Sequence, residues 1–279
     1  MARVRELLDA AGAQYSLATT DGRTEATALA ANTPAGAIVV AVGGDGTAHE
    51  VAKGLVMANR SGLDSGGRVL GVVPVGSGDD FGFALGLDRR DLAQAVTRLL
   101  EPAPRSIDLG WVNDEPFING VGIGFDAEVA ERLESVPSYL KGLAAYLYAT
   151  LRTLGPSLPR PVRILVDGLE VYSGRALLVA AQNGPRTGGS FLFSPEARND
   201  DGLLDFVFAE DLSLAGTLGL LPRVMRGRHL GHPKVKLLRG TSLELHWEQP
   251  RAAHAEGEAL GASEVHNIWL EPAGLSVLG

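Results

Sequence analysis

The chain has 279 residues, of which 45% are hydrophobic and 21% charged, with a formal net charge of −8 and no cysteine. It is long enough to bury a sizeable core and to form two domains. The lack of cysteine excludes a disulfide framework and a thiolate metal site. The negative charge argues against a general nucleic-acid binder and against broad attraction to anionic lipid.

No segment has the sequence of a membrane span or of a secretion signal. The longest uninterrupted apolar runs fall far short of the roughly 18 residues that a span requires. The chain does not open with a basic stretch followed by an apolar one. We therefore expect a cytoplasmic protein, in which any contact with a membrane is peripheral.

The first part of the chain alternates between helical and strand patterns. In chain order, the spacing of apolar residues predicts a helix at 4–11, a strand at 15–18, a helix at 24–31, a buried strand at 38–42, a helix that Thr47 caps, a second buried strand at 69–75 and a helix that Asp88 caps. Pro102 and Pro104 then break the pattern, and we place a domain boundary there. Residues 1–105 are expected to form a three-layer α/β nucleotide-binding domain.

The second part of the chain has the alternation typical of antiparallel strands. Apolar and more polar residues alternate at 162–166 and at 243–247, and Asn113-Asp114 and Asp167-Gly168 are turn signals. Helical patterns interrupt the strands at about 138–154 and 213–225. We expect residues 106–272 to form an antiparallel β-sandwich with inserted helices.

A glycine-rich turn follows the first buried strand and leads directly into a helix. Gly43, Gly44 and Gly46 have no Cβ, so the backbone N–H groups of this turn can approach a phosphate closely. Asp45 lies among them, and a carboxylate beside phosphate is repulsive unless a cation or a sugar hydroxyl lies between. We interpret Asp45 as acting through Mg²⁺ or on the nucleotide.

A second turn of the same kind follows the second buried strand. It reads Gly76-Ser77-Gly78-Asp79-Asp80-Phe81. Two such turns, one strand–helix unit apart, are expected to meet at the carboxyl edge of a parallel sheet.

Five segments together resemble the motifs of the diacylglycerol kinase catalytic-domain family, which also holds the sphingosine kinases and the soluble bacterial lipid kinases. The two glycine turns resemble the family's GGDGT and GTGNDFAR motifs. Three later segments, 117–126, 195–205 and 256–258, resemble its F-N-x-x-x-x-G-F-D, P-x-A-x-x-D-G-x-L-D and D-G-E segments. These five motifs occur in the family's order over nearly the whole chain.

The resemblance implies an ATP- and Mg²⁺-dependent kinase that phosphorylates a lipid hydroxyl, with diacylglycerol as the first candidate. It also implies that the final segment, 273–279, returns to the first domain. Catalytic roles fall by resemblance on Asp45 and on Glu258, which would be the base for the attacking hydroxyl. The nucleotide-binding residues would be Thr20, Gly43, Gly44, Asp45, Gly46, Thr47, Glu50, Ser77 and Asp80.

Some of these residues have a plainer interpretation. Thr20 is equally well a surface turn residue, and Glu50 is better interpreted as a capping or surface carboxylate than as a ligand contact. Without the other motifs, Glu258 would be read as a hairpin-turn carboxylate. The six histidines, His254 among them, show no metal-ligand spacing, and we treat them as structural.

A structural Mg²⁺ is a further implication of the resemblance. The Asp201 side chain and the backbone carbonyls of Arg198 and Leu203 would hold it, since hard oxygen ligands suit that ion. From the sequence alone, Asn199-Asp200-Asp201-Gly202 is better interpreted as a hydrophilic turn.

A local basic patch lies in the otherwise acidic chain. Residues 222–240 contain Arg223, Arg226, Arg228, Lys234, Lys236 and Arg239 and no acid. Each cation near an anionic membrane surface contributes about 1 kcal/mol, so the patch is a candidate for peripheral membrane contact. A solvated face is the favoured interpretation. We expect no nucleic-acid partner, and the oligomeric state cannot be predicted.

Departures from the family pattern leave two other functions open. The family begins with a strand and an N-P-x-S-G turn, whereas this chain begins with a helical pattern, and Asp79, Phe83 and Glu256 replace the family's Asn, Arg and Asp. These differences allow a non-catalytic protein that binds nucleotide or lipid. A kinase for a small soluble acceptor, similar to the NAD kinases that share the Gly-Gly-Asp-Gly turn, is the other alternative.

Overall fold

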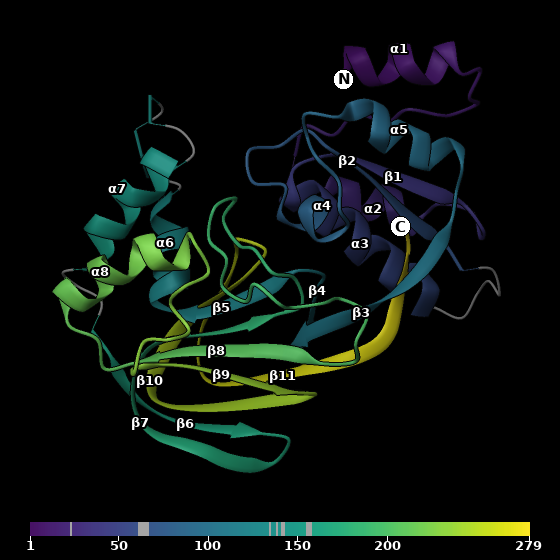
Figure 1. Cartoon of the computed structure of the whole chain (residues 1–279). Helices are drawn as coiled ribbons and strands as arrows, with labels where there is room; N and C mark the ends of the chain where they lie inside the picture. Colours follow the sequence, from purple (N-terminus) through teal and green to yellow (C-terminus); the bar gives the residue numbers. More distant parts are fainter. Residues whose placement is uncertain (23, 61–66, 134, 138, 141–142, 155–157) are drawn as a thin grey trace. The chain divides into compact units, whose positions relative to one another are not determined.

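The computed structural model describes residues 1–22, 24–60, 67–133, 135–137, 139–140, 143–154 and 158–279 (Figure 1). The chain forms two compact units. The N-terminal unit comprises Met1–Asp108 together with Pro272–Gly279, and the C-terminal unit comprises Leu109–Glu271.

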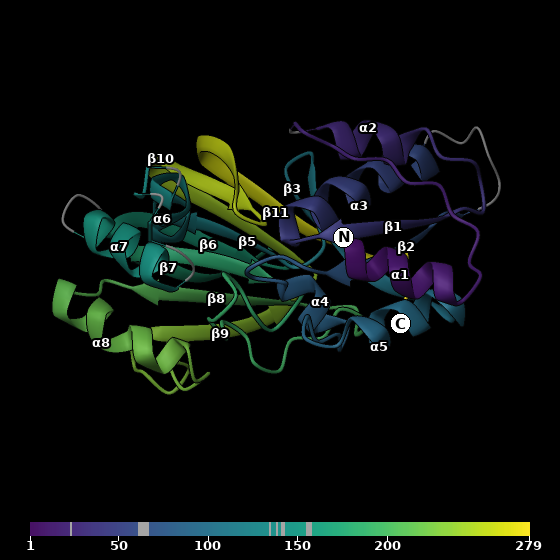
Figure 2. The same ribbon diagram turned by 90° about the horizontal axis from the view of Figure 1, so that it is seen from above.

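The N-terminal unit has three layers, in which a sheet lies between two groups of helices (Figure 2). Strands β1 and β2 are parallel neighbours, and the end of β11 continues the sheet by pairing Ser276 and Val277 with Val69 and Leu70. Helices α2 and α3 cover one face, and α5 and α1 cover the other. The elements are α1 (Ala2–Ala10), α2 (Glu25–Ala31), β1 (Ile38–Gly43), α3 (Asp45–Arg60), β2 (Val69–Pro74), α4 (Asp80–Ala84), α5 (Leu92–Leu100), the first part of β3 (Pro104–Val112) and the end of β11 (Glu258–Leu278).

Helix α3 owes its position to one apolar stripe. Ala48, Val51, Ala52 and Leu55 recur at helical spacing and are buried. On the opposite side, Gly54 lets α2 approach, because a Cβ at this position would overlap the Thr27 carbonyl oxygen and crowd the Ala30 side chain. A larger side chain at Gly54 would therefore push α2 away from α3.

Three details of the N-terminal unit differ from the sequence prediction. Residues 15–18 are exposed and form no strand, because an apolar run becomes a strand only where a partner edge is available. Helix α3 begins at Asp45, so Thr47 lies inside its first turn and is not its cap. Asp91 rather than Asp88 caps α5, accepting a hydrogen bond from the Gln94 amide at 3.0 Å.

The C-terminal unit is an antiparallel β-sandwich with helices added to it (Figure 1). Neighbouring strands run in the order β11-β10-β5-β7-β8-β9, while β6 pairs with both β10 and β7, and β4 pairs with β3. The elements are the rest of β3, β4 (Glu115–Phe117), β5 (Gly120–Gly124), α6 (Phe125–Leu133), α7 (Leu143–Leu154), β6 (Arg160–Val166), β7 (Leu169–Gln182), β8 (Leu204–Glu210), α8 (Leu214–Val224), β9 (Val235–Gly240), β10 (Ser242–Ala255) and most of β11.

Two apolar cores share the strands of this unit. On β8, Phe206 and Phe208 point into the core between the sheet layers, and the intervening Val207 and Ala209 point into a second core under the helices. The two-residue periodicity of a strand produces this division, since successive side chains lie on opposite faces. The strands therefore read as nearly continuous apolar runs.

The expected helices of the second part are present. Helix α8 is capped by Ser213, whose Oγ accepts a hydrogen bond from the Gly216 amide. Helix α7 corresponds to the pattern at 138–154, of which residues 138, 141 and 142 lie outside the described residues. The expected turns carry positive φ angles at Asn113 (52°) and Asp167 (48°). No helix among the described residues has the length and apolar character needed to cross a membrane.

His266 on β11 generates a prediction about acid stability. Its side chain is 2% exposed, and burial lowers its pKa to about 4. Because the folded-state pKa lies below the ordinary value of about 6.5, protons bind preferentially to the unfolded chain as the pH falls. The free energy of unfolding should therefore fall as the pH drops from about 6.5 to 4, and the His266 contribution to this loss should be about 3 kcal/mol.

Urea unfolding at a series of pH values checks this expectation. The wild type should lose about 3 kcal/mol more between pH 7 and pH 4 than the His266→Gln variant, which has no titrating group at this position. Equal losses in both proteins would contradict the assignment.

Candidate functional site

The first glycine turn is as short as a strand-to-helix connection can be. Gly43 ends β1, Asp45 begins α3, and only Gly44 lies between them. The first amides of a helix have no carbonyl partner within it, so the first turn of α3 presents N–H donors at the end of the sheet. The side chain of Thr47 packs back against Gly43, where a Cβ would crowd it.

The two glycine turns are in direct backbone contact. A Cβ built on Gly44 would lie 3.2 Å from the Cα of Gly76, and one built on Gly76 would overlap the Cα of Gly44. The Val75 amide also donates to the Gly43 carbonyl at 3.0 Å. The predicted convergence of the two turns is confirmed, and it follows from the parallel pairing of β1 with β2.

Two aspartates hold these turns in shape. Asp45 Oδ1 accepts a hydrogen bond from the Phe81 amide at 3.0 Å, which ties the start of α3 to the second turn. Asp79 has a left-handed backbone (φ 55°), and its Oδ1 accepts a hydrogen bond from the Gly76 amide at 2.9 Å. A carboxylate at position 79 is therefore used within the turn itself.

The remaining residues predicted to bind nucleotide occupy different surroundings. Asp80 is buried at the start of α4, while Ser77 lies in the second turn itself. Glu50, in α3, has a buried Oε2 with no hydrogen-bond partner among the described residues. Thr20 lies in the irregular segment before α2 and takes no part in the hydrogen bonds that join the turns.

Arg89 is a candidate residue that the sequence did not indicate. Its guanidinium donates to the carbonyls of Ser77 at 2.8 Å and Gly76 at 3.4 Å. It places a positive charge at a turn that otherwise carries carboxylates. No motif contains this arginine, and only the path of the chain after α4 brings it back to the second turn.

The donor set near the turns fits a metal ion that binds mainly through its substrate. Among the described residues, no group of three or more histidines and carboxylates is close enough to hold a metal on its own. Mg²⁺ commonly uses one or two carboxylates together with substrate phosphates and water. Asp45, with one oxygen already bound to the Phe81 amide, and Asp80 are compatible with that kind of site.

In the C-terminal unit, the predicted base lies beside a tightly held hairpin turn. Glu258 begins β11, directly after the turn residues Glu256 (φ 53°) and Gly257 (φ 85°). Oε1 of Glu256 accepts hydrogen bonds from three consecutive amides, those of residues 118, 119 and 120, at 3.1, 2.6 and 3.1 Å. The longer side chain at position 256 thus anchors the turn.

A second anchor reaches the same turn from the other side. His254 Nδ1 accepts a hydrogen bond from the Gly257 amide at 3.0 Å, and its Nε2 lies 2.9 Å from Asp126 Oδ2. Asp126 Oδ1 accepts a hydrogen bond from the Tyr146 hydroxyl at 3.3 Å. Burial, with the nearby Asp126 charge, raises the pKa of Tyr146 well above its ordinary value, so Tyr146 remains a donor.

Asp126 and Tyr146 also border an enclosed apolar cavity of about 60 Å³ under the helices. Most of its lining is aliphatic or aromatic, with Phe125, Phe191, Phe193, Val207, Leu220 and Leu221 among the residues that form it. His229 is buried there, and burial lowers its pKa. Its volume is well below that of a ligand pocket, so it is a small void in the core under the helices.

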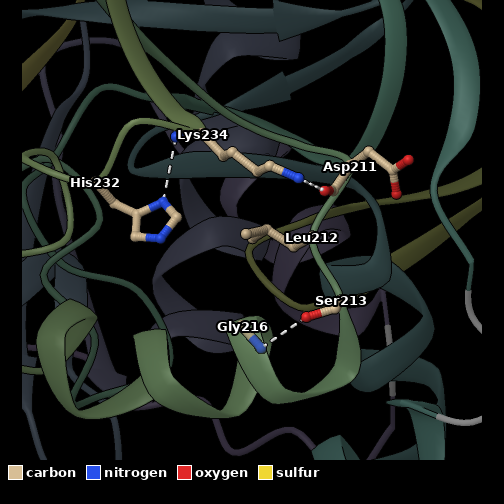
Figure 3. Close-up of a pocket in the computed structure, with 6 residues that line it drawn as sticks. All are labelled: Asp211, Leu212, Ser213, Gly216, His232 and Lys234. Atoms are coloured by element: carbon tan, nitrogen blue, oxygen red, sulfur yellow. Dashed lines mark hydrogen bonds between the residues drawn. The ribbon is translucent and has the colours of Figure 1, made fainter.

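A larger, open pocket of about 450 Å³ lies at the start of α8 (Figure 3). Lys234 Nζ donates to the Asp211 carbonyl at 2.5 Å, and the Lys234 amide donates to His232 Nδ1 at 3.2 Å. Its polar groups are thus bonded to one another. None of the residues predicted to be catalytic, nucleotide-binding or metal-binding lines this pocket.

At Asp201, where a structural Mg²⁺ was predicted, the guanidinium of Arg239 is the neighbouring cation. Arg239 donates to Asp201 Oδ2 at 2.7 Å and to Asp205 Oδ1 at 2.6 Å, and Asp201 Oδ1 accepts from the Leu203 amide at 3.2 Å. The hydrogen bond with Asp205 raises the pKa of Arg239. A dication beside this guanidinium would be repelled, so the Asp201 side chain does not fit the ion here.

Comparison with known proteins agrees with this architecture. Residues 1–112 match the model of the diacylglycerol kinase catalytic domain, and residues 119–279 match that of the YegS C-terminal NAD kinase beta sandwich-like domain. The chain is 30% identical to a diacylglycerol kinase of Bacillus subtilis (strain 168), over 79% of this chain and 71% of the relative. It is 29% identical to one of Staphylococcus carnosus (strain TM300), over 79% and 70%.

Solved structures share the fold at low sequence identity. A diacylglycerol kinase from Bacillus anthracis str. Sterne superimposes with a TM-score of 0.68 at 19% identity, covering 98% of this chain and 90% of that one. An NAD kinase from Archaeoglobus fulgidus in complex with ATP gives a TM-score of 0.51 at 14% identity, covering 100% and 88%. The chain therefore belongs to the family of lipid kinases that combine a diacylglycerol kinase catalytic domain with a YegS-type C-terminal β-sandwich domain.

Proposed function

We propose that this protein transfers the γ-phosphate of ATP to the hydroxyl group of a lipid alcohol, with diacylglycerol as the first candidate. The observation that carries this proposal is the backbone contact between Gly44 and Gly76. It brings two N–H-rich turns to one edge of a parallel sheet, where phosphates are commonly bound.

The N-terminal unit holds the nucleotide in this proposal. The first-turn amides of α3 donate to phosphate oxygens, and Ser77 adds a hydroxyl donor. Arg89, bonded to the second turn at 2.8 Å, offsets the negative charge that carboxylates bring there. Mg²⁺, contacted by Asp45 and Asp80, would neutralise the charge on the phosphates when bound.

The C-terminal unit binds the lipid acceptor in this proposal and supplies the base. The hydroxyl oxygen of the lipid attacks the γ-phosphorus, the bond from that phosphorus to the β,γ-bridging oxygen breaks, and ADP leaves. The hydroxyl proton passes to a carboxylate oxygen of Glu258, which begins β11. The Glu256 anchor supports this role, since a base must be held in one place to be effective.

The named relatives favour a lipid over a small soluble acceptor. The chain is 30% identical to a diacylglycerol kinase of Bacillus subtilis, whereas the NAD kinase that shares its fold is 14% identical. The NAD kinase-like alternative is therefore second.

The residues that first suggested a non-catalytic protein have local functions. Asp79 accepts the Gly76 amide within its own turn, and Glu256 accepts three amides at the β4–β5 connection. Both departures from the family pattern are therefore compatible with an ordered site. Phe83, which is 45% exposed, has no such explanation.

The helices that border the cavity support peripheral contact with a membrane. Leu151 on α7 is 59% exposed and Leu218 on α8 is 38% exposed, and Arg223 lies in the last turn of α8. Apolar side chains with neighbouring cations are typical of a surface that rests on anionic lipid. Lys236 and Arg239 contribute less, because they pair with Glu210, Asp201 and Asp205.

Incubation of the purified protein with labelled ATP, Mg²⁺ and a panel of acceptors tests the proposal. We expect label in a lipid alcohol and none in NAD. The Glu258→Gln variant should lower kcat by about 100-fold or more while binding ATP normally, because only proton acceptance is removed. Glu264→Gln, an exposed change on the same strand, is the matched control and should act as wild type. Transfer to NAD, or unchanged turnover by the Glu258 variant, would contradict this assignment.

A pair of glycine variants separates folding from nucleotide binding. In Gly76→Ala, the new Cβ overlaps Gly44, so we expect about 1–3 kcal/mol of destabilisation and loss of ATP binding. In Gly46→Ala, the new Cβ meets nothing within 4 Å, so the protein should keep its stability. Its ATP affinity should still fall about tenfold, because the Cβ blocks close approach of phosphate.

Thermal unfolding and calorimetric titration with ATP give the two readouts for these variants. Wild-type ATP affinity in both would show that the glycine turns do not bind the nucleotide.

A leucine variant tests membrane contact. Leu151→Glu should reduce sedimentation with vesicles of mixed neutral and anionic lipid at least severalfold, since it puts a charge on an apolar contact surface. Leu169→Glu replaces a leucine that is 72% exposed at the start of β7, and it should sediment as wild type does. Equal sedimentation of all three proteins would exclude this surface.

A further inference from the structure

A buried hydrogen-bonded chain runs from the lining of the apolar cavity to the turn that carries Glu258. It consists of the Tyr146 hydroxyl, the Asp126 carboxylate, the His254 imidazole and the Gly257 amide, with successive distances of 3.3, 2.9 and 3.0 Å. Asp126 and His254 are 5% and 4% exposed. Hydrogen bonds among such buried groups are sensitive to the loss of a single partner.

These hydrogen bonds fix the tautomer of His254. Nδ1 accepts the Gly257 N–H, so it carries no proton, and Nε2 must then be the protonated nitrogen that donates to Asp126. Asp126 in turn holds the imidazole ring in this tautomer. Gly122 on β5 makes room for the pair, because a Cβ there would overlap Asp126 Oδ2 and approach His254 Nε2 to 2.5 Å.

We propose that His254 is a positioning residue that holds the turn carrying Glu258 in its working place. This inference rests on the proposed function of Glu258 as the base. Glu256 fixes one end of the two-residue turn through three amides, and His254 fixes the other through Gly257. Without the second anchor, only Glu256 and the strand pair of Ala255 with Glu258 hold the turn, so Glu258 is less closely positioned.

Two substitutions of His254 separate the two nitrogens. In His254→Asn, the amide oxygen lies where Nδ1 was and can still accept the Gly257 N–H, while the contact with Asp126 is lost. In His254→Gln, the amide nitrogen can still donate to Asp126, while no acceptor remains for Gly257. Neither side chain titrates.

Steady-state kinetics distinguish these variants. We expect His254→Gln to lower kcat by about 10–100-fold with the KM for ATP unchanged, as a displaced catalytic group does. His254→Asn should keep kcat within about threefold of wild type. Equal loss in both variants, or wild-type kinetics in both, would overturn the proposal.

A measurement independent of turnover keeps the inference testable if no kinase activity is found. Nitrogen-15 NMR of the wild-type protein should show an unprotonated Nδ1 and a protonated Nε2 on His254 at neutral pH. The Gly257 amide resonance should move more in His254→Gln, which leaves this N–H without its acceptor, than in His254→Asn. A protonated Nδ1 at neutral pH, or equal Gly257 shifts in the two variants, would refute the anchor, whatever the substrate is.

Discussion

The close approach of two backbones at Gly44 and Gly76 is the constraint on which the N-terminal unit depends. Neither residue can carry a Cβ without moving the other, so both turns need glycine at these positions in order to meet. The Asp45 carboxylate then holds the second turn through the Phe81 amide, and Asp79 closes that turn on itself. The result is an edge with N–H groups of α3 exposed and little side-chain volume in front of them. Phosphoryl transfer requires such positioning more than it requires reactive side chains.

In the C-terminal unit, side chains rather than backbone contacts hold the turn in place. Glu256 and His254 hold the two-residue turn from both sides, next to the strand pair of Ala255 with Glu258, and Asp126 and Tyr146 extend the second anchor to the core under the helices. The strands β7 and β8 make this arrangement possible, because their alternate side chains fill two cores at once. One unit therefore contains both two apolar cores and a closely held turn beside Glu258.

Several arginines of this protein form ion pairs or hydrogen bonds with groups distant in the sequence. Arg239 joins Asp201 to Asp205 where a metal ion was predicted, and Arg89 brings a cation to the second glycine turn. Arg251, which lies in the core with 5% exposure, pairs with Glu128 and donates to the Leu177 carbonyl at 3.1 Å. A buried guanidinium without such partners would be strongly destabilising. The basic patch inferred from the sequence is accordingly divided, with Lys236 and Arg239 neutralised by carboxylates that lie far away in the chain.

The sequence by itself determined the order and type of most elements, because apolar periodicity reports directly which face of a helix or strand is buried. It also located both glycine turns and Glu258, since glycine at a strand-to-helix turn is a local requirement. It failed for residues 15–18 and for Thr47, where the outcome depended on a partner edge and on where the helix began. Tertiary structure alone decided the partners of Arg89, Glu256 and His254. Residues up to 138 positions apart form those hydrogen bonds, and no local pattern encodes which distant groups folding brings within 3 Å.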